Sequence, residues 1–140
     1  MKILFDARHI KDIYSGLARY THSILKALMK SSDFSRLEII LDKNEDYLSN
    51  PLFHDIQSYK TNKISFVYLD TPLFKMKHHL NISSFVNNSD CDIYFYPHFD
   101  LPVLIKKKSI FVVHDLFPLV MDDYIIKHRL AKTFYFKNII

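Results

Sequence analysis

The residues from Ser15 to Arg19 are of types that bind phosphate or sugar at the start of a helix. Gly16 is the one glycine in the chain, and glycine permits a sharp bend or the close approach of a ligand to the backbone. Ser15 stands where a helix N-cap belongs, and the N–H groups and dipole of a helix start attract anions. In this interpretation Arg19, which lies on the same predicted helix, contacts the bound anion. The simpler alternatives are a plain turn at Gly16 and an arginine in solvent.

Two more pairs of polar residues follow apolar stretches of the sequence. His114 and Asp115 come after the run SIFVV, and His98 and Asp100 lie in a loop bordered by prolines. A histidine in such a place binds a ligand through hydrogen bonds or takes part in proton transfer. The alternative for His114 is a hydrogen-bonded histidine of the core. His9, in the first loop, is a weaker candidate of the same kind.

Strands and helices alternate along the whole chain in the predicted secondary structure. Short apolar runs bounded by polar turns predict strands, and apolar residues three or four apart predict helices. In the first helix these apolar residues are Leu17, Tyr20, Ile24, Leu25 and Leu28. The predicted strands are 2–6, 36–42, 63–69, 92–96 and 109–114, and the predicted helices are 16–31, 51–58, 71–88 and 124–140.

This alternation predicts an α/β fold, with residues 1–140 forming a Rossmann-like three-layer domain around a mainly parallel sheet. In such sheets the ligand crevice lies beyond the carboxyl ends of the strands, at the point where the strand order reverses. We therefore expect the candidate residues at that edge, together with Asp6, Asp42 and Asp70, which end the first three strands. For Asp6 the alternative is that it only caps the following loop.

The composition is that of an ordinary globular domain, with 49% hydrophobic and 24% charged residues. The net charge of +4 permits an anionic partner. We find no nucleic-acid-binding motif and no Cys/His set with zinc spacing, and predict neither nucleic acid nor a metal. One cysteine, an acid already at Asp6 and no apolar run of about 18 residues predict a cytoplasmic protein.

Three segments together resemble a known family. The segments FDARHI…SGLARYTHSILKAL, YFYPHFDLP and IFVVHDLFPL are similar, in order and spacing, to the N-terminal domain of retaining glycosyltransferases of the GT-B fold. The resemblance is strongest to family 4, especially to mannosyltransferase-like members that build bacterial surface polysaccharide such as lipopolysaccharide. In that family two glycines often stand where Ser15 and Gly16 stand here. Its catalytic-site histidine, at the end of a strand, matches His114.

The resemblance implies the acceptor-binding half of a two-domain enzyme that moves a hexosyl group, such as mannosyl, from a nucleotide sugar to a glycan or lipid-linked acceptor. The half that holds most of the nucleotide-sugar site is not in this sequence, so we expect this chain alone to be inactive. His114 would hydrogen-bond the donor sugar and stabilise charge in the transition state. Ser15, Gly16, Arg19, His98, Asp100 and Asp115 would bind substrate, and the transfer would use no metal or other cofactor.

Three further expectations concern the partners of this chain. The helix 124–140 has no C-cap glycine, so we expect it to continue in a segment or separate chain that carries the second half. Two alternatives are a non-catalytic remnant that binds a glycan or a partner, and half of a sugar-nucleotide epimerase. Peripheral contact with the inner face of a membrane is predicted if a basic face attracts anionic lipid; its residues would be Lys75, Lys77, His78, His79, Lys106, Lys107 and Lys108.

Overall fold

The computed structural model of the protein describes residues 1–31, 33–71, 73 and 76–115, and for Met76 and Lys77 the backbone alone. The elements in chain order are β1 (Lys2–Asp6), the 3-10 helix η1 (Arg8–Lys11), α1 (Gly16–Ser31), β2 (Arg36–Asp42), α2 (Pro51–Gln57), β3 (Ile64–Leu69), α3 (Met76–Asn88), β4 (Ile93–Tyr96) and β5 (Ser109–Phe111). The predicted helix 124–140 and the loop from residue 116 lie outside the described residues.

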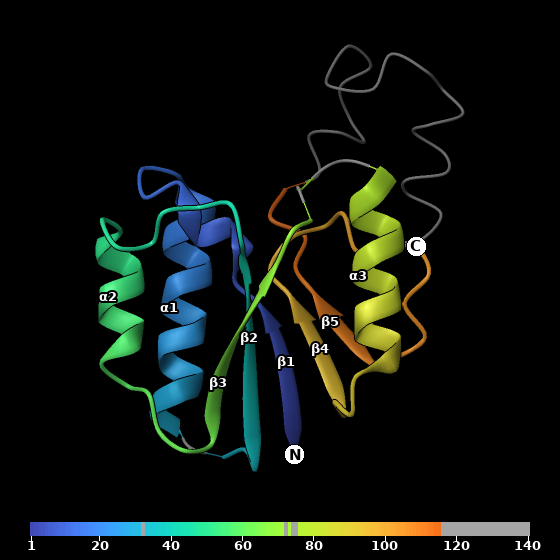
Figure 1. Cartoon of the computed structure of the whole chain (residues 1–140), viewed down its shortest axis with the longest axis horizontal. Helices are drawn as coiled ribbons and strands as arrows, with labels where there is room; N and C mark the ends of the chain where they lie inside the picture. Colours follow the sequence, from blue (N-terminus) through green and yellow to red (C-terminus); the bar gives the residue numbers. More distant parts are fainter. Residues whose placement is uncertain (32, 72, 74–75, 116–140) are drawn as a thin grey trace.

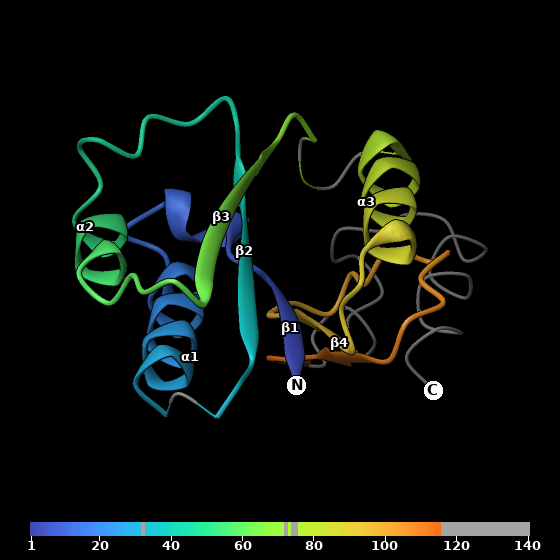
Figure 2. The ribbon, with the colours of Figure 1, turned by 60° about the horizontal axis from the view of Figure 1, so that its bottom comes forward.

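The strands form one parallel sheet in the order β3-β2-β1-β4-β5. Helices α1 and α2 cover one face and α3 covers the other (Figure 1 and Figure 2). The prediction of a Rossmann-like three-layer α/β domain is confirmed. Because the chain moves from β1 outward to β3 and then returns to the other side of β1, the strand order reverses between β1 and β4. Ligands of open parallel sheets bind beside such a reversal.

Side chains that alternate along the central strands build a hydrophobic cluster on each face. Phe5 packs in one cluster with Leu25 of α1 and Phe53 of α2. Leu4 packs in the other with Ile82 of α3. All five side chains are nearly or fully excluded from solvent. The strands are thereby held in place, and with them the loops that follow their carboxyl ends.

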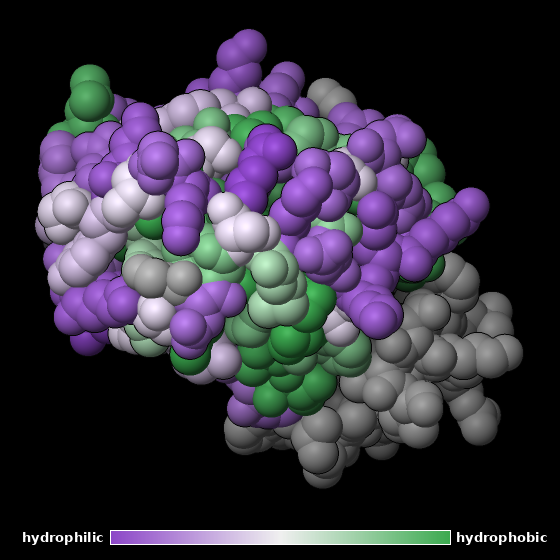
Figure 3. Space-filling model, turned by 90° about the horizontal axis from the view of Figure 1, so that it is seen from below, coloured by the Kyte–Doolittle hydropathy of each residue, from purple (hydrophilic) through white to green (hydrophobic). Residues whose placement is uncertain are grey.

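The two edges of the sheet differ in their polar contacts. At the edge where the strands begin, Lys2 and Arg36 approach Asp90 at 2.8 and 3.6 Å, and all three side chains are about half exposed. Seen from below, the surface is mainly hydrophilic, with a hydrophobic area near its middle (Figure 3). Exposed ion pairs like these contribute little to stability. The charged groups that are fully buried lie at the opposite edge, where the strands end.

Five predicted boundaries differ from the structure, and one of them is the end of α2, which is Gln57 rather than residue 58. Strands β3 and β4 begin one residue later than predicted, and β5 ends at Phe111 rather than at residue 114. Among the described strands, β5 pairs with β4 alone, whose last residue Tyr96 lies opposite Phe111 and is followed by Pro97. The residues after Phe111 therefore lie beyond the end of β4. Helix α3 is described from Met76, and Thr71, its predicted first residue, precedes Pro72, a position that avoids helical geometry.

The predicted N-cap of α1 is confirmed, and its predicted apolar face is only partly right. The Ser15 hydroxyl accepts a hydrogen bond from the Ala18 N–H at 3.0 Å. The fully buried residues of α1 are Ala18, Thr21, Leu25 and Met29; of the residues predicted for this face, only Leu25 is among them. Ile24 and Leu28 of the predicted face are partly buried and pack against the core, so the buried face lies beside the predicted one. Thr21 satisfies its hydroxyl by donating to the Leu17 carbonyl at 2.8 Å.

Among the described residues, no helix has the combination of length and hydrophobicity that crossing a membrane requires.

Candidate functional site

A buried ion pair lies directly beyond the carboxyl end of β1. Arg8 of η1 donates from Nε to Asp6 Oδ1 at 2.9 Å and from Nη2 to Asp6 Oδ2 at 2.6 Å. Neither side chain is exposed to solvent. Tyr94 of β4 donates its hydroxyl to Asp6 Oδ2 at 2.8 Å, and Arg8 Nη1 donates to the Thr71 carbonyl at 2.8 Å. These bonds tie the ends of β1 and β4 to the segment before α3.

Burial and the ion pair act in opposite directions on the charged groups of this network. Burial raises the pKa of Asp6, but the attraction and hydrogen bonds of Arg8 outweigh it, and the pKa lies below its usual value. For Arg8 burial lowers the pKa, and Asp6 more than restores it, so the guanidinium stays charged. Burial and the carboxylate of Asp6 raise the pKa of Tyr94 well above its usual value, which keeps its hydroxyl as a donor.

His78 also belongs to this network, and it comes from α3, the helix on the sheet face opposite to α1 and α2. Its Nδ1 lies 3.2 Å from Arg8 Nη2, and its side chain is fully buried. Because arginine is only a donor, Nδ1 accepts and the proton lies on Nε2, which has no hydrogen-bond partner among the described residues. Burial and the neighbouring Arg8 charge lower the pKa of His78 to about 4, so the ring is neutral at pH 7.

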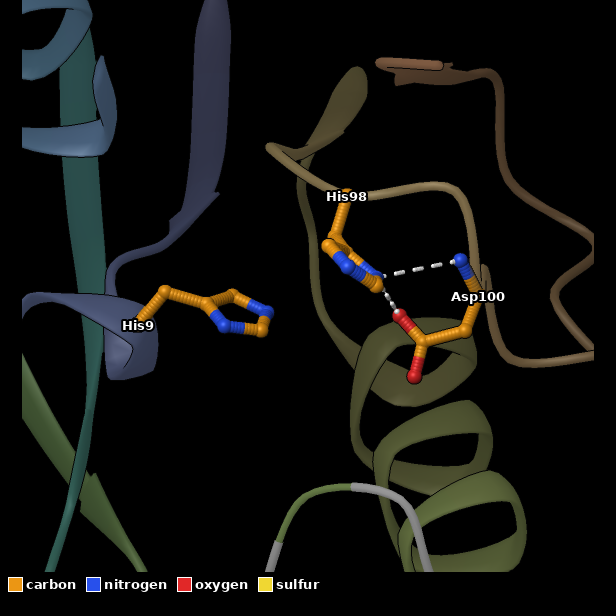
Figure 4. A group of neighbouring side chains, drawn as sticks. All are labelled: His9, His98 and Asp100. Carbon is orange, nitrogen blue, oxygen red and sulfur yellow. Dashed lines mark hydrogen bonds and ion pairs between the residues drawn. The ribbon is translucent and has the colours of Figure 1, made fainter. Parts of the chain in front are cut away.

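A second group, the His–Asp cluster of His9, His98 and Asp100, lies beside this network. His9 comes from η1, and the other two from the loop that follows β4, so the cluster flanks the reversal of strand order. His9 points across toward the His98–Asp100 pair (Figure 4). The rings of His9 and His98 stack with centroids 5.1 Å apart, and His98 Nδ1 is hydrogen-bonded to Asp100 Oδ1.

Tyr96 of β4 contacts the His–Asp cluster through its hydroxyl group. Its hydroxyl donates to Asp100 Oδ1 at 2.8 Å and lies 3.5 Å from His9 Nε2. Burial, followed by the Asp100 charge, raises the pKa of Tyr96 well above its usual value, so the hydroxyl stays a donor. Burial lowers the pKa of His9 to about 4, and His9 is therefore neutral at pH 7.

The structure brings His114 to the same edge. Its ring centroid lies 6.3 Å from that of His98, and Tyr20 of α1 meets the ring edge-on at 4.7 Å. His114 Nε2 lies 2.8 Å from the Pro97 carbonyl, so Nε2–H donates and Nδ1 is the nitrogen that remains for a ligand. The side chain is exposed, which contradicts the alternative of a core histidine.

The residues predicted at the start of α1 lie near this edge with different surroundings. Ser15 is engaged as the N-cap, and Arg19 is exposed. The backbone of Gly16 is not left-handed, and an added Cβ would meet nothing within 4 Å. The predicted bend therefore does not need glycine, and the space beside Gly16 is open. Asp115 is exposed at the end of the described segment.

Two predictions about charged side chains need correction. His78 is buried and His79 half-buried, so the predicted basic face does not include His78. Lys106 and Lys108 are exposed, while Lys75 and the side chain of Lys77 lie outside the described residues. For Asp6, a cap on the loop is only part of its role: its carboxylate accepts the backbone N–H of Arg8 at 3.2 Å and is also the buried partner of the Arg8 guanidinium.

Several residues of the site escaped the sequence analysis, above all Arg8, Tyr94 and Tyr96. An arginine two residues after an aspartate, inside an otherwise buried segment, is a signal for a buried pair, since a charge is rarely buried without a partner. The alternation DIYFY also puts both tyrosines on one face of β4. Zinc spacing rules describe ligands close together in sequence, and they do not cover His9 and His98, which the fold brings together.

Comparisons of the chain with protein-family models, with curated proteins and with solved structures find no significant match. A functional assignment therefore rests on the residues of this edge and their geometry.

Proposed function

We propose that this chain is the acceptor-side domain of a retaining, nucleotide-sugar-dependent glycosyltransferase of the GT-B type. The complete enzyme moves a hexosyl group, such as mannosyl, onto a glycan or lipid-linked acceptor. The motifs that resemble family 4 support this proposal, and so does the sheet, whose strand order suits a domain that binds its ligand at the carboxyl edge.

One observation carries the proposal: His98, Asp100 and His114 gather with Tyr20 beside the reversal of strand order. Ligand sites combine apolar or aromatic surfaces with a few fixed polar groups. Aromatic rings here provide a flat surface for a sugar ring, the imidazoles provide hydrogen bonds for its hydroxyl groups, and the buried Asp100 carboxylate holds the His98 ring. A half-buried loop held by Tyr96 keeps these groups in fixed positions.

The orientation of His114 suits the role proposed for it. Its Nε2–H is held by the Pro97 carbonyl, and Tyr20 supports the ring from α1. In the neutral ring Nδ1 accepts a hydrogen bond from a hydroxyl of the donor sugar. This bond fixes the sugar, and the imidazole stabilises positive charge that develops at the sugar in the transition state. The nucleoside diphosphate leaves toward the second half of the enzyme.

The test is transfer of labelled hexose from a nucleotide sugar to a lipid-linked glycan by the complete two-domain protein. We expect His114→Ala to lower turnover by about tenfold or more. The matched control is His54→Ala, on the far side of α2, where an exposed histidine bonds the Leu48 carbonyl at 2.6 Å; it should leave turnover unchanged. Turnover of His114→Ala within a few-fold of the original protein would contradict the proposed role.

The same assay separates the two alternatives from the proposal. Epimerisation or hydrolysis of the nucleotide sugar without acceptor would indicate an epimerase-type enzyme. Glycan binding without turnover of any nucleotide sugar would indicate a non-catalytic binding domain. Contact with a membrane is a further part of the proposal, with Lys106 and Lys108 as its exposed basic residues, and binding to anionic vesicles that decreases with salt would support it.

A further inference from the structure

Three side chains of the His–Asp cluster are of types that coordinate metal ions. One nitrogen of His9, one nitrogen of His98 and one oxygen of Asp100 all lie within 4.8 Å of one another. His9 comes from η1, which follows β1, and His98, 89 positions later, comes with Asp100 from the loop that follows β4. They converge on one point from two directions, with His9 on one side and the His98–Asp100 pair on the other (Figure 4).

The spacing is close to that of a coordinated ion. Zinc holds imidazole nitrogen and carboxylate oxygen at about 2.0–2.2 Å in a tetrahedral arrangement, which puts neighbouring ligand atoms about 3.3 Å apart. The separations of up to 4.8 Å in the structure exceed this value by about 1.5 Å. His98 Nδ1 and Asp100 Oδ1 are already in contact through a hydrogen bond, and an ion can take the place of the proton between them.

The surroundings of the cluster match those of metal ligands. Ligating carboxylates and imidazoles are usually held by hydrogen bonds from neighbouring groups, and the Tyr96 hydroxyl holds Asp100 at 2.8 Å and approaches His9 at 3.5 Å. Asp100 is itself almost completely buried, next to two imidazoles.

We propose that His9, His98 and Asp100 form a binding site for a divalent transition-metal ion, with zinc the best match. Two imidazoles and one carboxylate suit zinc and its first-row neighbours, whereas magnesium and calcium prefer sites made only of oxygen. Three protein ligands leave a position for water or for an oxygen of a bound substrate. This proposal goes beyond the glycosyl transfer, for which the resemblance implies no metal, and it shares His98 and Asp100 with the proposed sugar site.

The test is direct binding of Zn²⁺ and Co²⁺ to the 140-residue chain after treatment with a chelator. Calorimetry gives the stoichiometry and Kd for Zn²⁺, and the visible absorption of bound Co²⁺ reports its coordination. We expect one ion per chain, with a Kd at least tenfold weaker in His98→Ala and in Asp100→Asn. The control His54→Ala should bind as the original chain does.

A measurement on the unaltered chain guards against variants that fail to fold. In ¹⁵N spectra of the histidine rings, Zn²⁺ should shift signals of His9 and His98 and leave those of His22 and His54 in place. Absence of Zn²⁺ binding would overturn the proposal. So would binding that His98→Ala and Asp100→Asn do not weaken, or Zn²⁺-induced shifts confined to histidines outside the cluster.

Discussion

Removing the Arg8 side chain should destabilise the fold severely, because it leaves the Asp6 carboxylate buried without a counter-charge. In Arg8→Met the carboxylate keeps the Tyr94 hydroxyl at 2.8 Å and the N–H of residue 8 at 3.2 Å. It loses two guanidinium bonds of 2.9 and 2.6 Å, and the Thr71 carbonyl loses its donor. Breaking a buried pair from one side costs about 3–5 kcal/mol, a large part of a typical stability of about 5–15 kcal/mol.

Urea unfolding followed by circular dichroism measures this loss, and the double variant Asp6→Asn/Arg8→Met separates charge from packing. Asparagine still accepts from Tyr94 and carries no charge. We therefore expect the double variant to be more stable than Arg8→Met alone, even though it has one more substitution. A loss below about 1 kcal/mol in Arg8→Met, the value of an exposed pair, would refute the argument.

The pH dependence gives a second check on the same reasoning. In the original chain the pKa of Asp6 is lowered, so its contribution to stability is complete above the pKa of the unfolded chain and is lost on acidification below it. In Arg8→Met burial is opposed only by weaker groups, among them the Tyr94 hydroxyl, and it raises that pKa. Protonation then relieves the buried charge, and the difference in stability between variant and original should shrink as the pH falls from 7 toward 4. A difference that stays constant over this range would contradict the assignment.

Three further predictions concern stability, each measured by urea unfolding. The free energy of unfolding should fall as the pH is lowered from 6.5 to 4, because His9 and His78, with pKa values lowered to about 4, take up protons only when the chain unfolds. His78→Gln should make this pH dependence weaker. An unchanged pH dependence in His78→Gln would contradict the role given to His78. Ser15→Ala should cost about 1 kcal/mol through loss of the N-cap, while Ser23→Ala, at an exposed position of the same helix, should cost less. Leu25→Ala should cost about 2–5 kcal/mol, since its side chain is fully buried in the core; a cost below 1 kcal/mol would place it outside the core.

The sequence predicts the order of strands and helices well because hydrophobic periodicity is a local property. Strand β1 and helix α1 have the predicted bounds, and the Ser15 cap is local as well. The end of β5 depends instead on where its partner β4 stops, which local pattern does not contain. Helix η1 has only four residues, too few for a period to show.

For the site, sequence reasoning finds residues next to strand ends and misses those that act through long-range contacts. His98, Asp100 and His114 follow strands and were predicted at the carboxyl edge, where the structure has them. For Arg8, the pairing with Asp6 is local, but its contacts with Thr71 and His78, 63 and 70 positions away, depend on the fold. The pairing of His9 with His98 likewise requires β1 and β4 to be neighbours in the sheet.

The most direct test of the proposed function is a histidine-resolved titration of this chain with its expected ligand. A mannose-containing oligosaccharide is added up to millimolar concentration while the ring signals of all histidines are followed by NMR, assigned with single His→Gln variants. The account predicts that the signals of His98 and His114 shift together and saturate, while those of His22 and His54 stay in place. Unchanged signals of His98 and His114, or shifts confined to His22 and His54, would contradict a sugar site at the carboxyl edge of the sheet.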